Sequence, residues 1–218
     1  MKYKMLGSFT VLFFLTSLVS CNTATTVFTD TSLQEIPVSS RCVVKRLCYI
    51  YDASNLKELS NLSDYIVVGT LLDDAKQKLY YPDPNKNDTA FYGVTVSSFK
   101  ISKVFKGNVK EGETIKIAET YYSQEMNGET VHYLLDYGPS EPNRDYIFFL
   151  NKETDKTNEF FYGYFSPSMR EKARYPFLNR PLSAEITLQD IEGFTLVGVS
   201  DGKYLSLLEE VRAFLGVN

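Results

Sequence analysis

Residues 91–105 read FYGVTVSSFKISKVF, a run rich in β-branched and aromatic residues that predicts one long strand. The apolar positions before Ser97 have one parity along the strand, whereas Phe99 and Ile101 have the other. Successive side chains of a strand point to opposite faces, so a change of phase at Ser97 and Ser98 predicts a β-bulge there. A bulge bends a strand, as the wall of a small barrel requires.

Two other segments, 64–72 (DYIVVGTLL) and 146–150 (YIFFL), are apolar at nearly every position, which predicts strands covered on both faces. Residues 114–118 (TIKIA) alternate cleanly and predict a further strand. Weaker strands are predicted over 131–135, over 160–165 as the hairpin partner of 146–150, and over 194–199, with a loop over 76–89. The doubly apolar strands and the bent strand favour a closed barrel over an open sheet.

Helices are predicted at both ends of this β region. Ser54 or Asn55 can cap a short helix whose leucines at 56, 59 and 62 share one face. An amphipathic helix follows Asp201, and its apolar face consists of Tyr204, Leu207, Leu208, Val211, Phe214 and Leu215. The fold class is therefore mainly β, with a short N-terminal helix and a C-terminal amphipathic helix around one barrel domain over residues 41–218.

The first twenty residues have the pattern of an export signal. Lys2 and Lys4 precede an uncharged apolar stretch over 5–19, which is typical of a secretory signal peptide. The stretch ends in Leu18-Val19-Ser20-Cys21, which resembles the lipobox of bacterial lipoproteins. The resemblance implies a signal peptide over 1–20, a diacylglycerol on the thiol of Cys21, and a location on the extracytoplasmic face of the cell membrane. Residues 21–40 are interpreted as a flexible tether.

The barrel segments resemble a known group of proteins. The segments that carry the resemblance are 64–70 (DYIVVGT), 101–107 (ISKVFKG), 112–117 (GETIKI) and 145–150 (DYIFFL). They resemble bacterial lipoproteins with an OB-type barrel, grouped with the netrin-like and metalloprotease-inhibitor-like barrels, over about residues 54–165. The resemblance implies a small OB-like β-barrel and no catalytic residues. Animal inhibitors of that group chelate zinc through an N-terminal cysteine, which here would be the acylated Cys21, so their mechanism is not expected.

Cys42 and Cys48 remain once Cys21 is acylated. Six residues on a straight strand span roughly 20 Å at about 3.3 Å per residue, too far for a disulfide. A bond between them requires a turn within residues 43–47, and a disulfide and two free thiols both stay open. Two cysteines and the only histidine, His132, do not complete a zinc site, so no metal or cofactor is expected.

Charge argues against one class of partner. The chain has 23 Lys and Arg against 27 Asp and Glu, and the chain without its first twenty residues has 21 against 27. Nucleic-acid binding that does not depend on sequence needs clustered positive charge, so no nucleic-acid partner is expected.

Two motifs suggest chemistry but lack required parts. Gly198-Val199-Ser200-Asp201-Gly202 has the form of a nucleophile elbow, yet no histidine follows it, and Ser200 or Asp201 is better explained as a helix cap. Residues 83–88 (DPNKND) begin like a calcium loop, but Asp88 replaces the needed glycine and Val94 stands where the closing glutamate should be.

One stretch predicts a binding surface. Over residues 160–180, aromatic and basic side chains interleave, and such pairs can stack on sugars, peptides or bases. The predicted surface consists of Tyr162, Tyr164, Arg170, Arg174 and Tyr175. The alternative is that the aromatic residues belong to the core and the basic residues are simply solvated.

These observations favour a membrane-anchored, non-enzymatic module that binds or scaffolds an unknown protein or envelope ligand. An alternative is an envelope enzyme or inhibitor module with a carboxylate-based site. A third is a self-protection or assembly factor that meets only a protein partner, which predicts an exposed apolar patch within residues 166–192.

Overall fold

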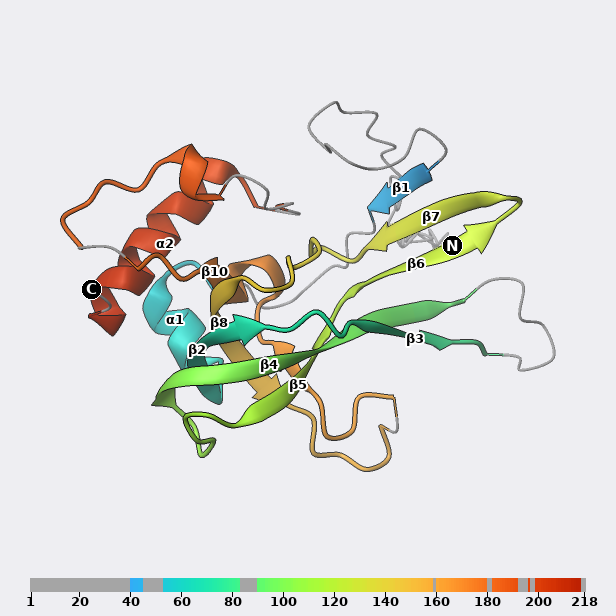
Figure 1. Cartoon of the computed structure of the whole chain (residues 1–218), viewed down its shortest axis with the longest axis horizontal. Helices are drawn as coiled ribbons and strands as arrows, with labels where there is room; N and C mark the ends of the chain where they lie inside the picture. The colour runs from blue at the N-terminus through green and yellow to red at the C-terminus, as the bar shows by residue number, and fades with distance from the viewer. Residues whose placement is uncertain are drawn as a thin grey trace, which may run out of the picture.

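The computed structural model describes residues 53–82, 90–158, 160–179, 182–191, 196 and 199–216, together with the backbone of 40–44. The fold is mainly β, with two α-helices in this part of the chain, as predicted. Figure 1 shows the strands crossing the centre and right of the molecule and the helices gathered at the left.

Five strands form a small closed barrel: β2 (Tyr65–Leu71), β4 (Tyr92–Lys106), β5 (Thr114–Glu119), β8 (Asp145–Lys152) and β9 (Phe165–Pro167). β2 pairs with β4 on one side and with β8 on the other, both antiparallel. β5 pairs antiparallel with β4 and parallel with β9. β9 also pairs with β8, which completes the ring, and this arrangement is compatible with the predicted OB-like fold.

The barrel interior is apolar. It contains Val67, Leu71, Phe99, Ile101, Ile115, Ile117, Tyr146, Phe148, Leu150 and Phe165. The rings of Phe99 and Phe148 meet edge to face with their centroids 5.1 Å apart, a favourable geometry for aromatic pairs. These side chains come from alternate positions of each strand, so the other positions face outward.

The helices are α1 (Leu56–Asn61) and α2 (Asp201–Leu215). The side chain of Asn55 caps α1 by accepting a hydrogen bond from the backbone N–H of Glu58 at 3.0 Å. Ser200 occupies the N-cap position of α2 without a side-chain capping bond. One residue of the predicted apolar face of α2, Phe214, is 58% exposed, whereas the other five are partly or fully buried in the core.

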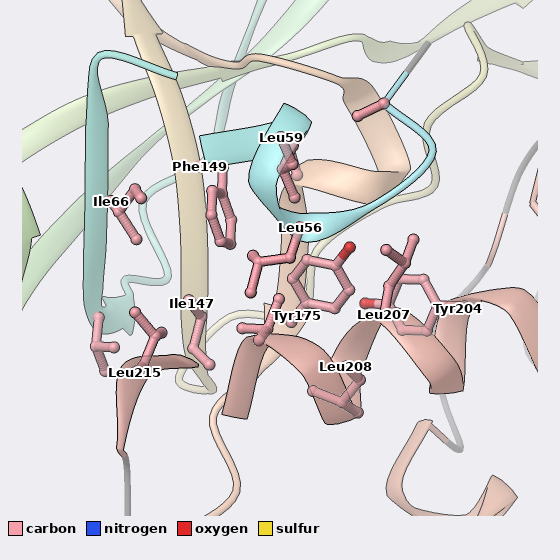
Figure 2. Close-up of a cluster of buried hydrophobic side chains, with 14 of the residues drawn as sticks. Leu56, Leu59, Ile66, Ile147, Phe149, Tyr175, Tyr204, Leu207, Leu208 and Leu215 are labelled. Carbon is pink, nitrogen blue, oxygen red and sulfur yellow. The ribbon is translucent and has the colours of Figure 1, made fainter. Parts of the chain in front are cut away.

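The outward face of β2 and β8 packs beneath both helices. Ile66 of β2 and Ile147 and Phe149 of β8 meet leucines of α1 and α2 in a second apolar cluster, which Figure 2 shows. β10 (Arg174–Pro176) pairs antiparallel with β8, and its Tyr175 lies within the same cluster. The two apolar faces of β2 and β8 therefore serve two different cores, which explains their nearly continuous hydrophobic sequences.

A second sheet lies beyond the barrel and differs from the prediction. Its strands are β6 (Tyr121–Met126), β7 (Glu129–Leu134) and β1 (Ser40–Val44), the last paired in parallel with β7. β6 was not predicted, although Asn127-Gly128 joins it to β7 in a two-residue turn with positive φ at both residues. Such a pair is a strong hairpin signal.

Two further predictions, both about the strands next to β4, were wrong. Residues 76–80 form strand β3 on the edge of β4 rather than a loop, and their polar sequence suits an exposed edge. The irregular pairing of β4 lies opposite Ile66–Val67 and Val68–Gly69, not at Ser97 and Ser98, whose pairing with β5 is regular.

The segment 160–165 forms turns, and the partner strand β9 begins only at Phe165. Most of the predicted strand over 194–199 lies outside the described residues.

Two glycines give a matched test of the barrel packing. A Cβ on Gly69 would lie 2.2 Å from the backbone oxygen of Lys100, whereas a Cβ on Gly202 in α2 meets nothing within 4 Å. We expect Gly69→Ala to destabilise the fold by about 1–3 kcal/mol because the β2–β4 contact must open. Gly202→Ala should stabilise it by about 0.5 kcal/mol. Urea unfolding measures both, and equal midpoints for the two variants would contradict this packing.

Candidate functional site

A cleft of 380 Å³ lies where the loop between β8 and β9 folds against the end of the barrel. Its volume falls within the range of small-molecule sites. Its walls come from the ends of β5 and β8, the loop over 153–164, β9, and the short 3-10 helix η1 (Arg170–Ala173). The lining residues are Thr120, Tyr137, Asn151, Lys152, Glu153, Asn158, Phe161, Tyr164, Ser166, Pro167, Ser168 and Arg170.

Hydrogen bonds at its base hold the loop over 153–164 in place. The backbone N–H of Glu153 donates to the carbonyl of Tyr164, and the N–H of Gly163 donates to the carbonyl of Glu153, both at 3.0 Å. Two residues after Glu153, the Asp155 carboxylate accepts hydrogen bonds from the backbone N–H and the hydroxyl of Thr157, which lower the pKa of Asp155. The loop therefore presents its aromatic residues from a fixed base.

Five aromatic residues form what we call the aromatic rim: Tyr80 of β3, Tyr92 of β4, and Phe160, Phe161 and Tyr164 of the loop over 153–164. The ring of Phe160 lies 5.0 Å from Phe161 and 5.7 Å from Tyr92, with the rings at steep angles. Tyr80 is 48% exposed, so the rim reaches solvent at that end. Phe161 and Tyr164 also line the cleft, which makes the rim and the cleft one continuous surface.

Lys78 of β3 contacts the loop over 153–164. Its ammonium lies 4.9 Å from the ring centre of Phe160 and 5.3 Å from that of Tyr164. The same ammonium donates to the carbonyl oxygen of Phe160 at 2.7 Å. Cation–π contacts and this hydrogen bond hold the rim together.

Some polar groups of the cleft are engaged in the fold. The side chain of Asn151 accepts from the N–H of Asp64 and donates to the carbonyl of Leu62. Ser168 shares a 2.6 Å hydrogen bond with Ser63. These contacts fix the cleft wall and leave little of either side chain for a ligand.

Other polar groups of the cleft remain available. Among the described residues, the hydroxyls of Tyr164 and Ser166 have no hydrogen-bond partner, and neither has the side-chain oxygen of Asn158, whose amide nitrogen donates to Glu153 at 2.9 Å. The available groups are thus uncharged donors and acceptors.

Arg170 and Asp136 form an ion pair at the wall of the cleft. Their φ angles are 54° and 50°, a left-handed conformation that is uncommon for residues other than glycine. Burial lowers the pKa of Arg170 to about 10, which still leaves the guanidinium charged at neutral pH. Paired residues in strained conformations often mark a functional site, and this pair fixes the position of η1 beside the cleft.

A buried polar network lies behind this wall. The guanidinium of Arg174 donates to Ser140 at 2.8 Å, to the carbonyl of Gly138 at 3.0 Å, and to the carboxylate of Glu171. One carboxyl oxygen of Glu119 accepts from Ser140 and from Tyr137 at 2.6 Å, while the other has no partner in the described structure. Burial raises the pKa of Glu119, which favours its protonated form.

The predicted binding surface is partly corrected by these positions. Tyr164 and Arg170 line the cleft, and Tyr162 is 46% exposed on the loop nearby. Arg174 and Tyr175 are fully buried and cannot belong to a surface. Arg174 pairs with Glu171 inside the protein, and Tyr175 stacks on Tyr204 of α2, so both belong to the core. Sequence reasoning missed Tyr80 and Tyr92 because Tyr80 lies within a segment interpreted as a loop and Tyr92 lies in the strand that follows it.

The only histidine is not part of a recognisable catalytic group. His132 of β7 shares a 2.7 Å hydrogen bond with Ser123 of β6, and burial lowers its pKa. Ser200 lies at the start of α2, on the opposite side of the molecule in Figure 1. The elbow motif and the histidine are therefore not brought together.

The cysteine predictions stay untested. Cys21 and Cys48 lie outside the described residues, and the backbone of Cys42 in β1 is in register with His132. The calcium-like segment over 83–88 also lies outside them. Among the residues that the structure describes, no group of three His, Cys, Asp or Glu could hold a metal ion, and neither helix is long and apolar enough to cross a membrane.

No known family model matches the chain, and no curated protein matches it at a significant level. The candidate site is therefore identified from the geometry of the described residues alone.

The carboxyl of Glu119 predicts a dependence of stability on pH. Its pKa is raised in the folded state, so its contribution is fully present below the unfolded pKa of about 4.3 and is lost as pH rises through the folded value. Glu119→Gln keeps the acceptor for Tyr137 and cannot ionise. We expect the stability of this variant, relative to the natural protein, to increase between pH 4 and pH 8 in urea unfolding.

Glu209→Gln, at an exposed position of α2, controls for the loss of one negative charge. Parallel pH profiles for Glu119→Gln and the natural protein would contradict the protonated state of Glu119.

Proposed function

We propose that this chain is a lipoprotein anchored to the extracytoplasmic face of the cell membrane, and that its barrel is a non-enzymatic binding module. The observation that carries this proposal is the cleft with its aromatic rim, in which Phe160, Phe161 and Tyr164 come from the loop that joins β8 and β9, the fourth and fifth strands of the barrel in chain order. The loop at this position is one that OB-type barrels use for binding. The ligand or partner is a component of the cell envelope.

Binding fits the chemistry of the cleft better than catalysis does. Among the described residues that line it, Glu153 is the one carboxylate, and both of its oxygens accept hydrogen bonds within the loop. Hydrolysis by paired carboxylates needs a second acid facing the same space. Glu119, the acid with a raised pKa, lies buried behind the wall. The described part of the cleft thus offers recognition groups without a catalytic pair.

The membrane anchor is supported by the order of charged, apolar and small residues before Cys21. The similarity to netrin-like and inhibitor-like barrels belongs to the same proposal, and it brings no inhibitory mechanism because the terminal cysteine would carry lipid. The acidic balance of the chain supports a partner other than nucleic acid.

The anchor is tested by fractionating cells that express the full chain. The natural protein should sediment with membranes and give a mature mass that begins at Cys21 with added lipid. Cys21→Ala should prevent both processing and lipid attachment. A natural protein that retains Met1, or whose residue 21 has a free thiol, would sink the lipoprotein proposal.

The binding module is tested by hydrogen–deuterium exchange of the full-length protein, with and without envelope extract. We expect the extract to slow exchange in the loop over 153–164 and in β9, because a ligand there excludes water. Phe161→Ala should lose this protection, whereas Phe214→Ala, an exposed aromatic residue on α2, should keep it. Equal exchange with and without extract would contradict the proposal.

A further inference from the structure

We infer that the ligand of this cleft is an uncharged oligosaccharide, whose terminal sugar enters the cleft while the following sugars lie along the aromatic rim. This inference depends on the proposed binding function and specifies its ligand class. Three properties of the site support it: its balance of charge, the kind of polar group it leaves available, and the pairing of the described strands beside it.

The charge at the cleft is nearly balanced. Among its described lining residues, Lys152 and Arg170 are basic and Glu153 is acidic, and Arg170 is paired with Asp136. The ammonium of Lys152 lies over the ring of Phe165 at 5.0 Å. A site for phosphate or a nucleic acid backbone gathers several cations without carboxylates among them. This balance favours a ligand without net charge.

The available polar groups match sugar hydroxyls. The hydroxyls of Tyr164 and Ser166 can each donate and accept, and the side-chain oxygen of Asn158 can accept. Sugar hydroxyls have the same double capacity. Phe161 lines the same cleft as these groups, so the cleft offers a ligand both hydrogen-bonding groups and an aromatic ring.

The rim continues away from the cleft. Phe161 lies 5.8 Å from Tyr92, and Phe160 lies 6.1 Å from the more exposed Tyr80, centroid to centroid. The aromatic path thus leads from the cleft to the exposed ring of Tyr80. Such a path suits a chain of several rings better than a single compact molecule.

Among the described residues, the strands that line the cleft leave little free edge for an extended peptide to join. β5 pairs with β4 over Thr114–Glu119 and with β9 at Ile117, and β9 also pairs with β8. β8 pairs with β2 along one edge and with β10 and β9 along the other. Peptides that bind by strand addition need a free row of backbone N–H and carbonyl groups. A ligand recognised through side chains is favoured instead.

The inference is tested by calorimetry on the full-length protein in a detergent that contains no sugar. The probes are neutral tetrasaccharides of glucose, N-acetylglucosamine, galactose or mannose, a tetrasaccharide of galacturonic acid, an octathymidylate and a tetra-alanine peptide. We expect saturable binding of at least one neutral tetrasaccharide, and weaker or no binding of the other three probes.

Variants locate the site. Phe161→Ala and Tyr164→Ala should each weaken binding about tenfold, as the loss of one stacked ring does. Tyr164→Phe keeps the ring and should lose less. Phe214→Ala should bind as the natural protein does, and unfolding midpoints confirm that each variant is folded.

Three outcomes overturn the inference. If no neutral sugar binds while envelope extract still protects the loop over 153–164, the ligand class is wrong and the binding function stands. If the extract also gives no protection, both proposals fail together. If a sugar binds equally to Tyr164→Ala and to the natural protein, its site lies elsewhere.

Discussion

The fold depends on burying both faces of two adjacent strands, β2 and β8. Val67 and Phe148 face the barrel interior, whereas Ile66 and Phe149 face the helices. Each strand therefore belongs to two apolar cores, and neither core is complete without the other. Removing apolar surface from water is the main favourable term in folding, so these two strands hold together the barrel on one side and the helices on the other.

The closed barrel supports the site, and the residues that can contact a ligand lie at its margin. Each of the five barrel strands pairs with two others of the ring, so much of their backbone hydrogen-bonding capacity is used within it. Phe161 and Tyr164 of the cleft lie in the loop between β8 and β9, which the hydrogen bonds at its base hold in place. A rigid ring that carries polar and aromatic loops is a common way to position a binding site.

Much of the barrel could be predicted from its hydrophobic pattern, because β5 has alternating apolar residues and β2 and β8 are apolar at nearly every position. The polar strand β3 could not, since an exposed edge leaves little hydrophobic signal in residues such as Lys76 and Lys78. The hairpin of β6 and β7 could have been predicted from Asn127-Gly128, a pair typical of two-residue hairpin turns, but strand propensity alone does not take such a pair into account. Arg174 was placed on the surface because sequence cannot reveal that Glu171 and Ser140 would neutralise and bond it inside the protein. The cleft joins segments far apart in the chain, so only Tyr164 and Arg170 of its lining residues were foreseen as site residues.

The order in which the chain is made limits when the barrel can form. β2 pairs with β8, whose residues come about 80 positions later, and the ring closes only through β9 at Phe165–Pro167. A growing chain therefore holds several apolar strands without partners until most of it has emerged. Pairings so distant in sequence are slow to form, and unpaired strand edges invite aggregation in the interval. Whatever cellular machinery handles this chain has to keep it unfolded and separate from its copies until its last third is available.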